Sequence, residues 1–316
     1  MFRIGLLHHG SSSSPALARF RTGLLRHALV DGANCLVDAL GAEGRWHRLP
    51  ALTAQLLQRK PDVLVAIGAL AALSAQRATS SIPILHAIVL DPVDIGLAAP
   101  NVTGVSSFDP EQPARHLSLL QQLLPGLRKV AFLADVEAPQ GCDGRSPLVT
   151  HLLQAASQLD LDLHGVALSS VEGNLEQPFD TLKLTGSQAL VALEVPTVLA
   201  RLPDIMTLAD RHRLPTLSPY GWRASGLVME GTSLHDALDP LAESVALVSR
   251  GTPVGAVPMR IVRHQRLVVR MDRARRIGLT IPTAVLQRAS LCVDETSDDA
   301  TDQRTRIDPP GGSPGW

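Results

Sequence analysis

Apolar runs of strand length alternate with amphipathic helical segments along most of the chain, and this order constrains the fold most strongly. Ile4–Leu7, Val63–Ile67 and Ile84–Leu90 are dominated by apolar residues, which is typical of strands buried on both faces. Ser14-Pro15 places a serine cap before a proline at the first helical position, so a helix should begin there. Strands that alternate with helices predict a parallel sheet covered on both sides.

The alternation starts again after residue 110. We expect a helix at Glu111–Leu124, strands at Lys129–Ala134 and Ala189–Leu193, and one continuous helix at Thr197–Arg211. Two such arrays in 316 residues suit two lobes of roughly 100–150 residues each. The sequence therefore predicts an α/β protein with two Rossmann-like, doubly wound lobes built on parallel sheets.

The amino-acid composition excludes several classes of function for this chain. Twenty-nine basic residues stand against 30 acidic ones, so the net charge of −1 gives no broad field for nucleic acid, and no nucleic-acid partner is expected. The chain has three cysteines, which are Cys35, Cys142 and Cys292. They lie far apart, without the spacing of a metal site, and an odd number does not form a complete set of disulfides. We predict no metal and no cofactor.

The first and last residues of the chain lead to two further predictions, one about location and one about disorder. Met1-Phe2-Arg3 runs directly into the first strand without the apolar stretch of a secretory signal, so the protein is expected in the cytoplasm if this start is correct. No apolar run reaches the roughly 18 residues of a membrane span. Residues 296–316 are rich in Asp, Gly and Pro, and we expect a disordered tail.

Ligands of open parallel sheets bind beyond the carboxyl ends of the strands, so the loops there are the candidate site. The predicted ligand-binding residues are His9, Gly10, Ser11, Ser12, Ser13, Gly68, Ala69, Leu70, Asp91, Pro92, Asp135, Glu194, Ser218 and Tyr220. The serine loop could hold an anion, or could be a flexible loop with one capping serine. It lacks the GxGxxG and GxxxxGK[ST] spacings, which argues against a nucleotide. The carboxylates could pair with a ligand amine, or could be solvated loop charges.

Catalysis is not predicted. No GxSxG elbow is present for a serine hydrolase. A two-lobed racemase would need one thiol from each lobe, and Cys142 lies in a suitable loop whereas Cys35 falls at the start of a strand, at the wrong edge of its sheet. We predict no catalytic residue.

Several segments, taken in order, resemble the ABC transporter substrate-binding proteins of the tryptophan-binding TrpX-like family. They include RIGLLHHGSSS, RWHRLPALTAQLLQRKPDVLVAIGALAALSAQRATSSIPIL, LADRHRLPTLSPYGWRASGLVMEGTS and ARRIGLTIPTAVLQRA. The resemblance implies a type I periplasmic binding fold, a small ligand such as an aromatic amino acid between the lobes, a membrane permease as partner and an extracytoplasmic location. It also implies that the chain crosses between the lobes. Lobe 1 would then comprise residues 1–107 and 232–260, and lobe 2 residues 108–231 and 261–295.

Three departures from the family pattern add negative charge, and one of them is Asp94-Ile95 after Asp91-Pro92-Val93, where small residues are usual. Asp135-Val136 replaces an Asn-Pro pair, and Glu230-Gly231 replaces Tyr-Gly. These acidic groups suggest an amine-bearing solute. The favoured function is the solute-binding component of an ABC importer, expected to be a monomer. The alternative is a cytoplasmic ligand-sensing or regulatory protein that keeps the same fold without export.

Overall fold

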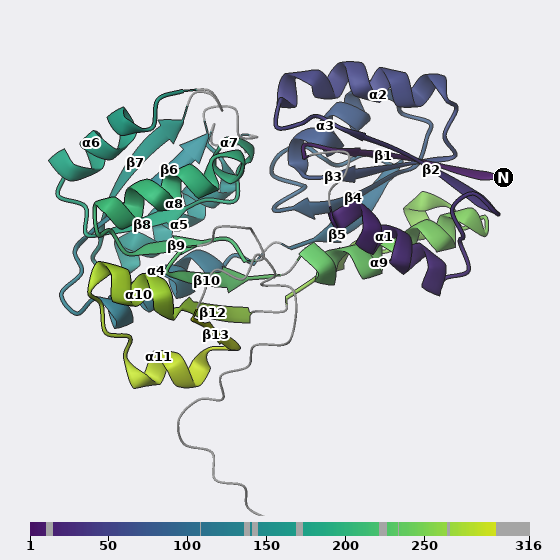
Figure 1. Cartoon of the computed structure of the whole chain (residues 1–316). Helices are drawn as coiled ribbons and strands as arrows, with labels where there is room; N and C mark the ends of the chain where they lie inside the picture. The colour runs from purple at the N-terminus through teal and green to yellow at the C-terminus, as the bar shows by residue number, and fades with distance from the viewer. Residues whose placement is uncertain are drawn as a thin grey trace, which may run out of the picture. The chain divides into compact units, whose positions relative to one another are not determined.

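The computed structural model describes residues 1–10, 15–107, 109–135, 140, 145–168, 173–220, 226–232, 234–263 and 266–294. The chain divides into two compact units, each built around one β-sheet (Figure 1). Unit 1 comprises Met1–Asp109, Ala138–Pro147 and Thr232–His264, and unit 2 comprises Pro110–Glu137, Leu148–Gly231 and Gln265–Trp316.

Unit 1 contains a six-stranded sheet in which every pairing is parallel. In spatial order its strands are β11 (Arg260–Ile261), β5 (Val102–Ser106), β4 (Ile84–Val89), β3 (Val63–Ile67), β1 (Phe2–His8) and β2 (Cys35–Gly41). Its helical segments are α1 (Pro15–Arg26), η1 (Trp46–Arg48), α2 (Leu49–Gln58), α3 (Ala69–Ala78), α9 (Leu234–Ser249) and η2 (Val254–Ala256).

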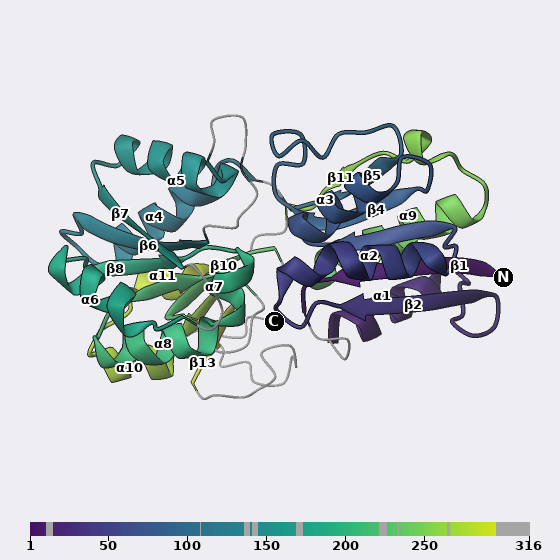
Figure 2. The same cartoon turned by 90° about the horizontal axis from the view of Figure 1, so that it is seen from above.

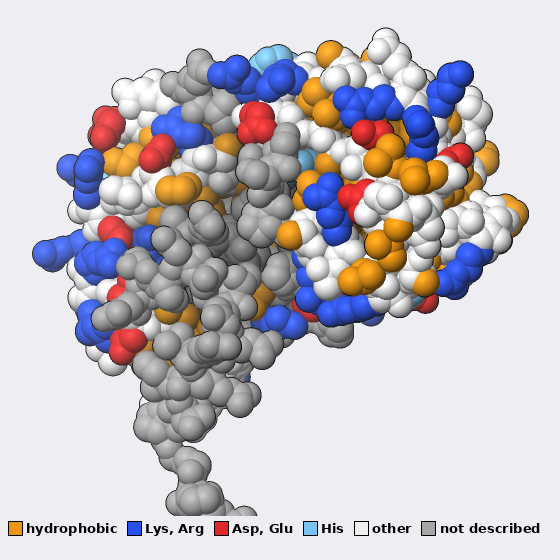
Figure 3. All heavy atoms as spheres, turned by 45° about the vertical axis from the view of Figure 1, so that its right-hand side comes forward, with side chains coloured by type: hydrophobic (Ala, Val, Ile, Leu, Met, Phe, Trp, Pro, Cys, Tyr) orange, Lys and Arg blue, Asp and Glu red, His pale blue; other side chains and the backbone are white. Residues whose placement is uncertain are grey.

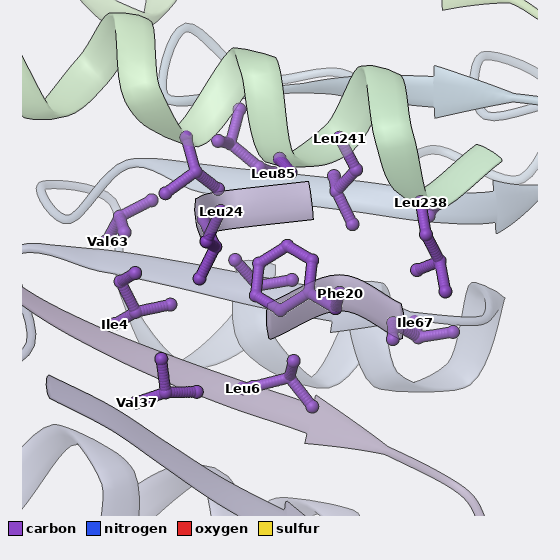
Figure 4. Close-up of a cluster of buried hydrophobic side chains, with 14 of the residues drawn as sticks. Ile4, Leu6, Phe20, Leu24, Val37, Val63, Ile67, Leu85, Leu238 and Leu241 are labelled. Atoms are coloured by element: carbon purple, nitrogen blue, oxygen red, sulfur yellow. The ribbon is translucent and has the colours of Figure 1, made fainter. Parts of the chain in front are cut away.

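Helices cover both faces of this sheet because its strands are apolar on both sides. On one face, Phe20 and Leu24 of α1 and Leu238 and Leu241 of α9 pack on strand residues such as Ile4 (Figure 4). On the other face, leucines and alanines of α2 and α3 pack on the opposite side chains of β1, β3 and β4. Because both faces are buried, each side chain along a strand must point to a particular face of the sheet. This requirement sets the pairing register of neighbouring strands, and therefore which residues lie at the strand ends.

Unit 2 contains a seven-stranded sheet. In spatial order its strands are β13 (Leu291–Val293), β12 (Arg266–Arg270), β10 (Val228–Gly231), β9 (Thr216–Ser218), β8 (Ala189–Ala192), β6 (Lys129–Asp135) and β7 (Asp162–Leu168). Its helices are α4 (Gln112–Leu123), α5 (Pro147–Gln158), α6 (Glu176–Leu184), α7 (Pro196–Ala200), α8 (Leu202–Arg211), α10 (Met271–Ile277) and α11 (Thr283–Arg288). Helix α5 covers one face of the sheet, and α6 and α8 cover the other (Figure 2).

The prediction of two doubly wound α/β sheets is confirmed, with one departure from the predicted parallel pairing. Strand β12 runs antiparallel to β10, and Gly231 is paired with Arg266. The chain leaves unit 2 at the end of β10 and re-enters it at residue 265, just before β12. Because exit and re-entry occur at the same end of β10, the next strand must run in the opposite direction.

The predicted helix at Thr197–Arg211 is wrong as a single element. It is two helices, α7 and α8, separated at Arg201, whose φ of −103° and ψ of 5° are not helical. Pro203 explains the break, because it has no N–H to donate to the carbonyl of Leu199 and its ring would clash with that carbonyl in a continuous helix. None of the helices in the described parts of the chain is both long and apolar enough to span a membrane.

Candidate functional site

Three neighbouring strands of unit 1 end at the same edge of the sheet. The register pairs His8 at the end of β1 with Ile67 of β3, and Ile67 with Ala87 of β4. The predicted residues that follow these strands, His9 and Gly68 among them, therefore lie at one edge. The backbone N–H of Gly68 also donates to the Ala87 carbonyl at 2.8 Å, which holds the two loops together.

Gly68 begins helix α3 in a conformation that only glycine adopts readily. Its φ of 95° and ψ of 152° lie in a region that side chains with a Cβ avoid. A Cβ at this position would lie 3.5 Å from Nδ1 of His9, so the imidazole lies close to the helix start. The first helical bond runs from Ala72 N–H to Gly68 O, which leaves the amides of Ala69 and Leu70 without intrahelical acceptors. This edge therefore presents hydrogen-bond donors.

The loop that carries His9 is anchored by the segment after β2. The carbonyls of His9 and Gly10 accept hydrogen bonds from Gly44 and Glu43, at 2.7 and 3.1 Å. Burial lowers the pKa of His9 to about 4, with a smaller contribution from His8, so the imidazole is neutral at pH 7 and offers one donor and one acceptor. The predicted ligand residues Ser11, Ser12 and Ser13 lie outside the described residues.

A bulge redirects the chain at the end of β4. Ile88 has a φ of 55°, which is unusual for a β-branched residue, and the pairing with β5 shifts between Ala87 and Val89. The chain then reaches Asp91, whose Oδ1 accepts the N–H of Asp94 at 3.1 Å. The Asp91 carboxylate thus stabilises its own turn, and the adjacent Pro92 is buried.

In unit 2 the corresponding edge is formed by β6, β8 and β9. Asp135, the last residue of β6, is buried and accepts the N–H of Thr197 at 2.9 Å. Thr197 lies in the first turn of α7, so this carboxylate satisfies a helix N-terminal amide, as a capping residue does. The ligand-binding role predicted for Asp135 stays a prediction, but one of its oxygens is already engaged within the protein.

Glu194 follows β8 and differs from its acidic neighbours. The register aligns Ala192 with Leu133 of β6 and Val191 with Leu217 of β9, which puts Glu194 between Asp135 and Tyr220 along the edge. Within the described residues Glu194 has no hydrogen-bond or ion-pair partner, and its side chain is only partly exposed. Burial raises its pKa to about 7. The carboxyl therefore has no compensating charge within the described residues, although its side chain keeps some exposed surface.

The two predicted residues after β9 have different surroundings. The buried Ser218 hydroxyl accepts the N–H of Gly226 at 2.9 Å, which ties the start of the next strand to β9. Tyr220 packs against the buried Met229 cluster, and the guanidinium of Arg266 lies 5.9 Å from its ring centre. Ser218 therefore has a structural bond, whereas Tyr220 contributes a partly exposed ring to the edge.

Sequence reasoning did not find the partners of Glu230. This carboxylate is buried at the end of β10, with Arg115 Nε 3.5 Å from one oxygen and His116 Nε2 3.7 Å from the other. Gln112 Nε2 also donates to the Glu230 carbonyl at 3.3 Å. The three partners are spaced three and four residues apart on α4, so they share a helix face, which is the sequence signal that could have found them. The added charge at Glu230 is balanced inside unit 2.

Metal and thiol chemistry receive no support from the described residues. Among them, no group of three or more His, Cys, Asp and Glu side chains is arranged to hold a metal ion. Cys35 is buried as the first residue of β2, at the amino edge of its sheet, as predicted. Cys142 lies outside the described residues.

Comparisons with known proteins agree with this architecture. The family model described as "ABC transporter substrate binding protein" matches residues 9–293. A tyrosine-binding protein of Clostridioides difficile (strain R20291) is 22% identical over 283 residues, which cover 84% of this chain and 78% of the relative.

Two solved structures share the fold. A conserved domain protein of Vibrio cholerae has a TM-score of 0.82 and 22% identity, covering 92% of this chain and 99% of its own. An ABC domain of Streptococcus pneumoniae in complex with L-Trp has a TM-score of 0.79 and 20% identity, with the same coverage of both chains. At these identities the likeness of the structures establishes the fold alone.

Proposed function

Because the chain belongs to the family of ABC transporter substrate-binding proteins, we propose that it binds one small solute and presents it to a membrane permease. The solute contacts loops that follow the carboxyl ends of the parallel strands. The protein acts as a monomeric carrier and does not convert the solute chemically. Lys and Arg side chains are scattered over the face seen in Figure 3, which agrees with a small ligand rather than a polyanion.

The observation that carries this proposal is the arrangement of Gly68 and His9 at the start of α3. A glycine-only backbone conformation costs on the order of 1–3 kcal/mol for other residues and is characteristic of ligand-binding loops. Here it presents the amides of Ala69 and Leu70 beside a neutral imidazole. Such donors suit a carboxylate or another acceptor group of a solute.

An amino acid with an aromatic side chain is the solute class that we favour. The C. difficile relative is a tyrosine-binding protein, and the S. pneumoniae structure contains L-Trp. The partly exposed ring of Tyr220 offers this chain a surface on which an aromatic side chain could pack.

A thermal-shift screen tests the proposal. The protein is unfolded, dialysed and refolded to remove any carried ligand, and then melted with each of the twenty common amino acids. A ligand at 100 times its Kd stabilises the folded state by about 2.7 kcal/mol, so at least one aromatic amino acid should raise the Tm by several degrees. A Tm that no amino acid changes would refute this solute class.

A further inference from the structure

Asp91, Asp135, Glu194 and Glu230 are four of the described acidic residues at or near the carboxyl edges of the sheets, and three of these four are already engaged. Asp91 accepts the N–H of Asp94, Asp135 accepts the N–H of Thr197, and Glu230 lies between Arg115 and His116. Glu194 alone among these four has no such partner within the described residues.

The surroundings of Glu194 do not compensate for this isolation. It is flanked along the edge by Asp135, which is itself acidic, and by Tyr220, which brings an aromatic ring rather than a cation. Burial is the cause that raises its pKa to about 7, with no opposing charge effect. A carboxyl that is withdrawn from water without a partner destabilises the folded state, and such groups concentrate where a ligand provides the missing partner.

The position of Glu194 fits that role. It lies two residues beyond the end of the buried parallel strand β8, and ligands of doubly wound sheets bind just beyond such strand ends. Its side chain retains partial exposure, so a solute can reach the carboxyl. An ammonium is the group that best complements a partly buried carboxylate, because it supplies both the opposite charge and three hydrogen-bond donors.

We propose that Glu194 accepts the amino group of the bound solute and makes the site selective for amine-bearing solutes over deaminated analogues of the same shape. This inference rests on the proposed function and adds the residue that determines this selectivity. Of the acidic groups considered from the sequence, it assigns the amine contact to Glu194 rather than to Asp135 or Glu230.

Calorimetric titration of wild-type protein and Glu194→Gln tests the assignment. The solutes are L-tyrosine, L-tryptophan and their deaminated analogues, which keep the ring and the carboxylate. The wild type should bind the amino acid roughly 30-fold or more tightly than its deaminated analogue. Glu194→Gln should lose most of that preference while it binds the analogue as tightly as the wild type does. Glu176→Gln, an exposed glutamate of the same unit, is the matched control and should behave as the wild type.

Three results separate failure of this inference from failure of the proposed function. If the wild type binds the amino acid and its analogue equally, the assignment is wrong without any variant being needed. If Glu194→Gln keeps the full preference for the amine, Glu194 is not the contact. In both cases the carrier function stands. If the wild type binds none of the four solutes, the proposed ligand class fails, and this assignment fails with it.

Discussion

Glu194 and Gly68 each have an unusual feature at the carboxyl edge of a sheet. In Glu194 it is a carboxyl pKa that burial raises without a partner among the described residues, and in Gly68 it is a backbone conformation that residues with a Cβ avoid. The cost at Glu194 would be offset by a ligand amine under the proposed function, whereas glycine adopts its conformation without strain. We therefore predict that substitutions of Glu194 and of Gly68 have different effects on the free energy of unfolding and on ligand affinity.

Glu194→Gln should stabilise the unliganded protein, and the gain should depend on pH. The pKa of Glu194 rises from 4.5 to about 7 on folding, so the folded state binds the proton more tightly than the unfolded state. Glu194 therefore costs nothing below about pH 4.5 and its full penalty above about pH 7. Removing the charge should add roughly 1–3 kcal/mol of unfolding free energy at pH 8 and little at pH 4.5. Urea melts at both pH values measure this, and an equal effect at both would contradict it.

Gly68→Ala should lower both stability and ligand affinity. Its φ and ψ are closed to alanine, so either the strain of about 1–3 kcal/mol remains or the start of α3 moves. Gly96→Ala is the control, because Gly96 also has a positive φ, of 76°, but a Cβ there would meet nothing within 4 Å. The control should lose some stability and keep the wild-type Kd. Equal Kd values for both variants would remove Gly68 from the site.

At the scale of elements, the edge of unit 1 depends on how closely β4 and β5 approach each other. A Cβ on Gly104 would overlap the backbone of His86 in the neighbouring strand. Gly104→Ala should therefore separate the two strands and cost about 3 kcal/mol or more, measured by chemical unfolding. Gly255→Ala, whose Cβ would have only an ordinary contact with Pro100, should change stability by less than about 0.5 kcal/mol.

Helix α7 depends on the carboxylate of Asp135 for the amide of Thr197. Asp135→Ala should cost about 1 kcal/mol, the usual effect of losing a capping acceptor. Asp135→Asn keeps an acceptor oxygen and should remain within a few tenths of a kcal/mol of the wild type. Unfolding titrations of the two variants decide the point. An equal loss in both would show that the negative charge matters more than the hydrogen bond.

The sequence was sufficient to predict strands that are buried on both faces and the loops that follow them. The bounds of β3 match the predicted run Val63–Ile67, because this strand is apolar throughout and buried along its whole length. Helix α6 was missed, since only Phe179 and Leu182 are buried in it and the apolar stripe is short. Strand β13 is three residues long and is defined by its pairing with β12, which no local pattern reveals.

The position of the candidate site could be predicted from the sequence, but the roles of its individual residues could not. Parallel topology places Asp135 and Glu194 at the same edge, so sequence reasoning chose both. Whether each carboxylate has a partner depends on residues far away in sequence, as with the Thr197 amide 62 residues from Asp135. Such distant pairs are set by tertiary packing and leave no spacing signal in one sequence.

At the scale of the whole molecule, the central claim is that one small solute binds where the parallel strands of this chain end. Amide hydrogen exchange tests this most directly, because a bound ligand slows opening wherever it makes contacts. The stripped protein is compared with and without the amino acid that gives the largest thermal shift. We predict slower exchange in peptides that cover the strand-end segments, residues 66–73 and residues 192–198. Unchanged exchange in these segments would contradict the claim.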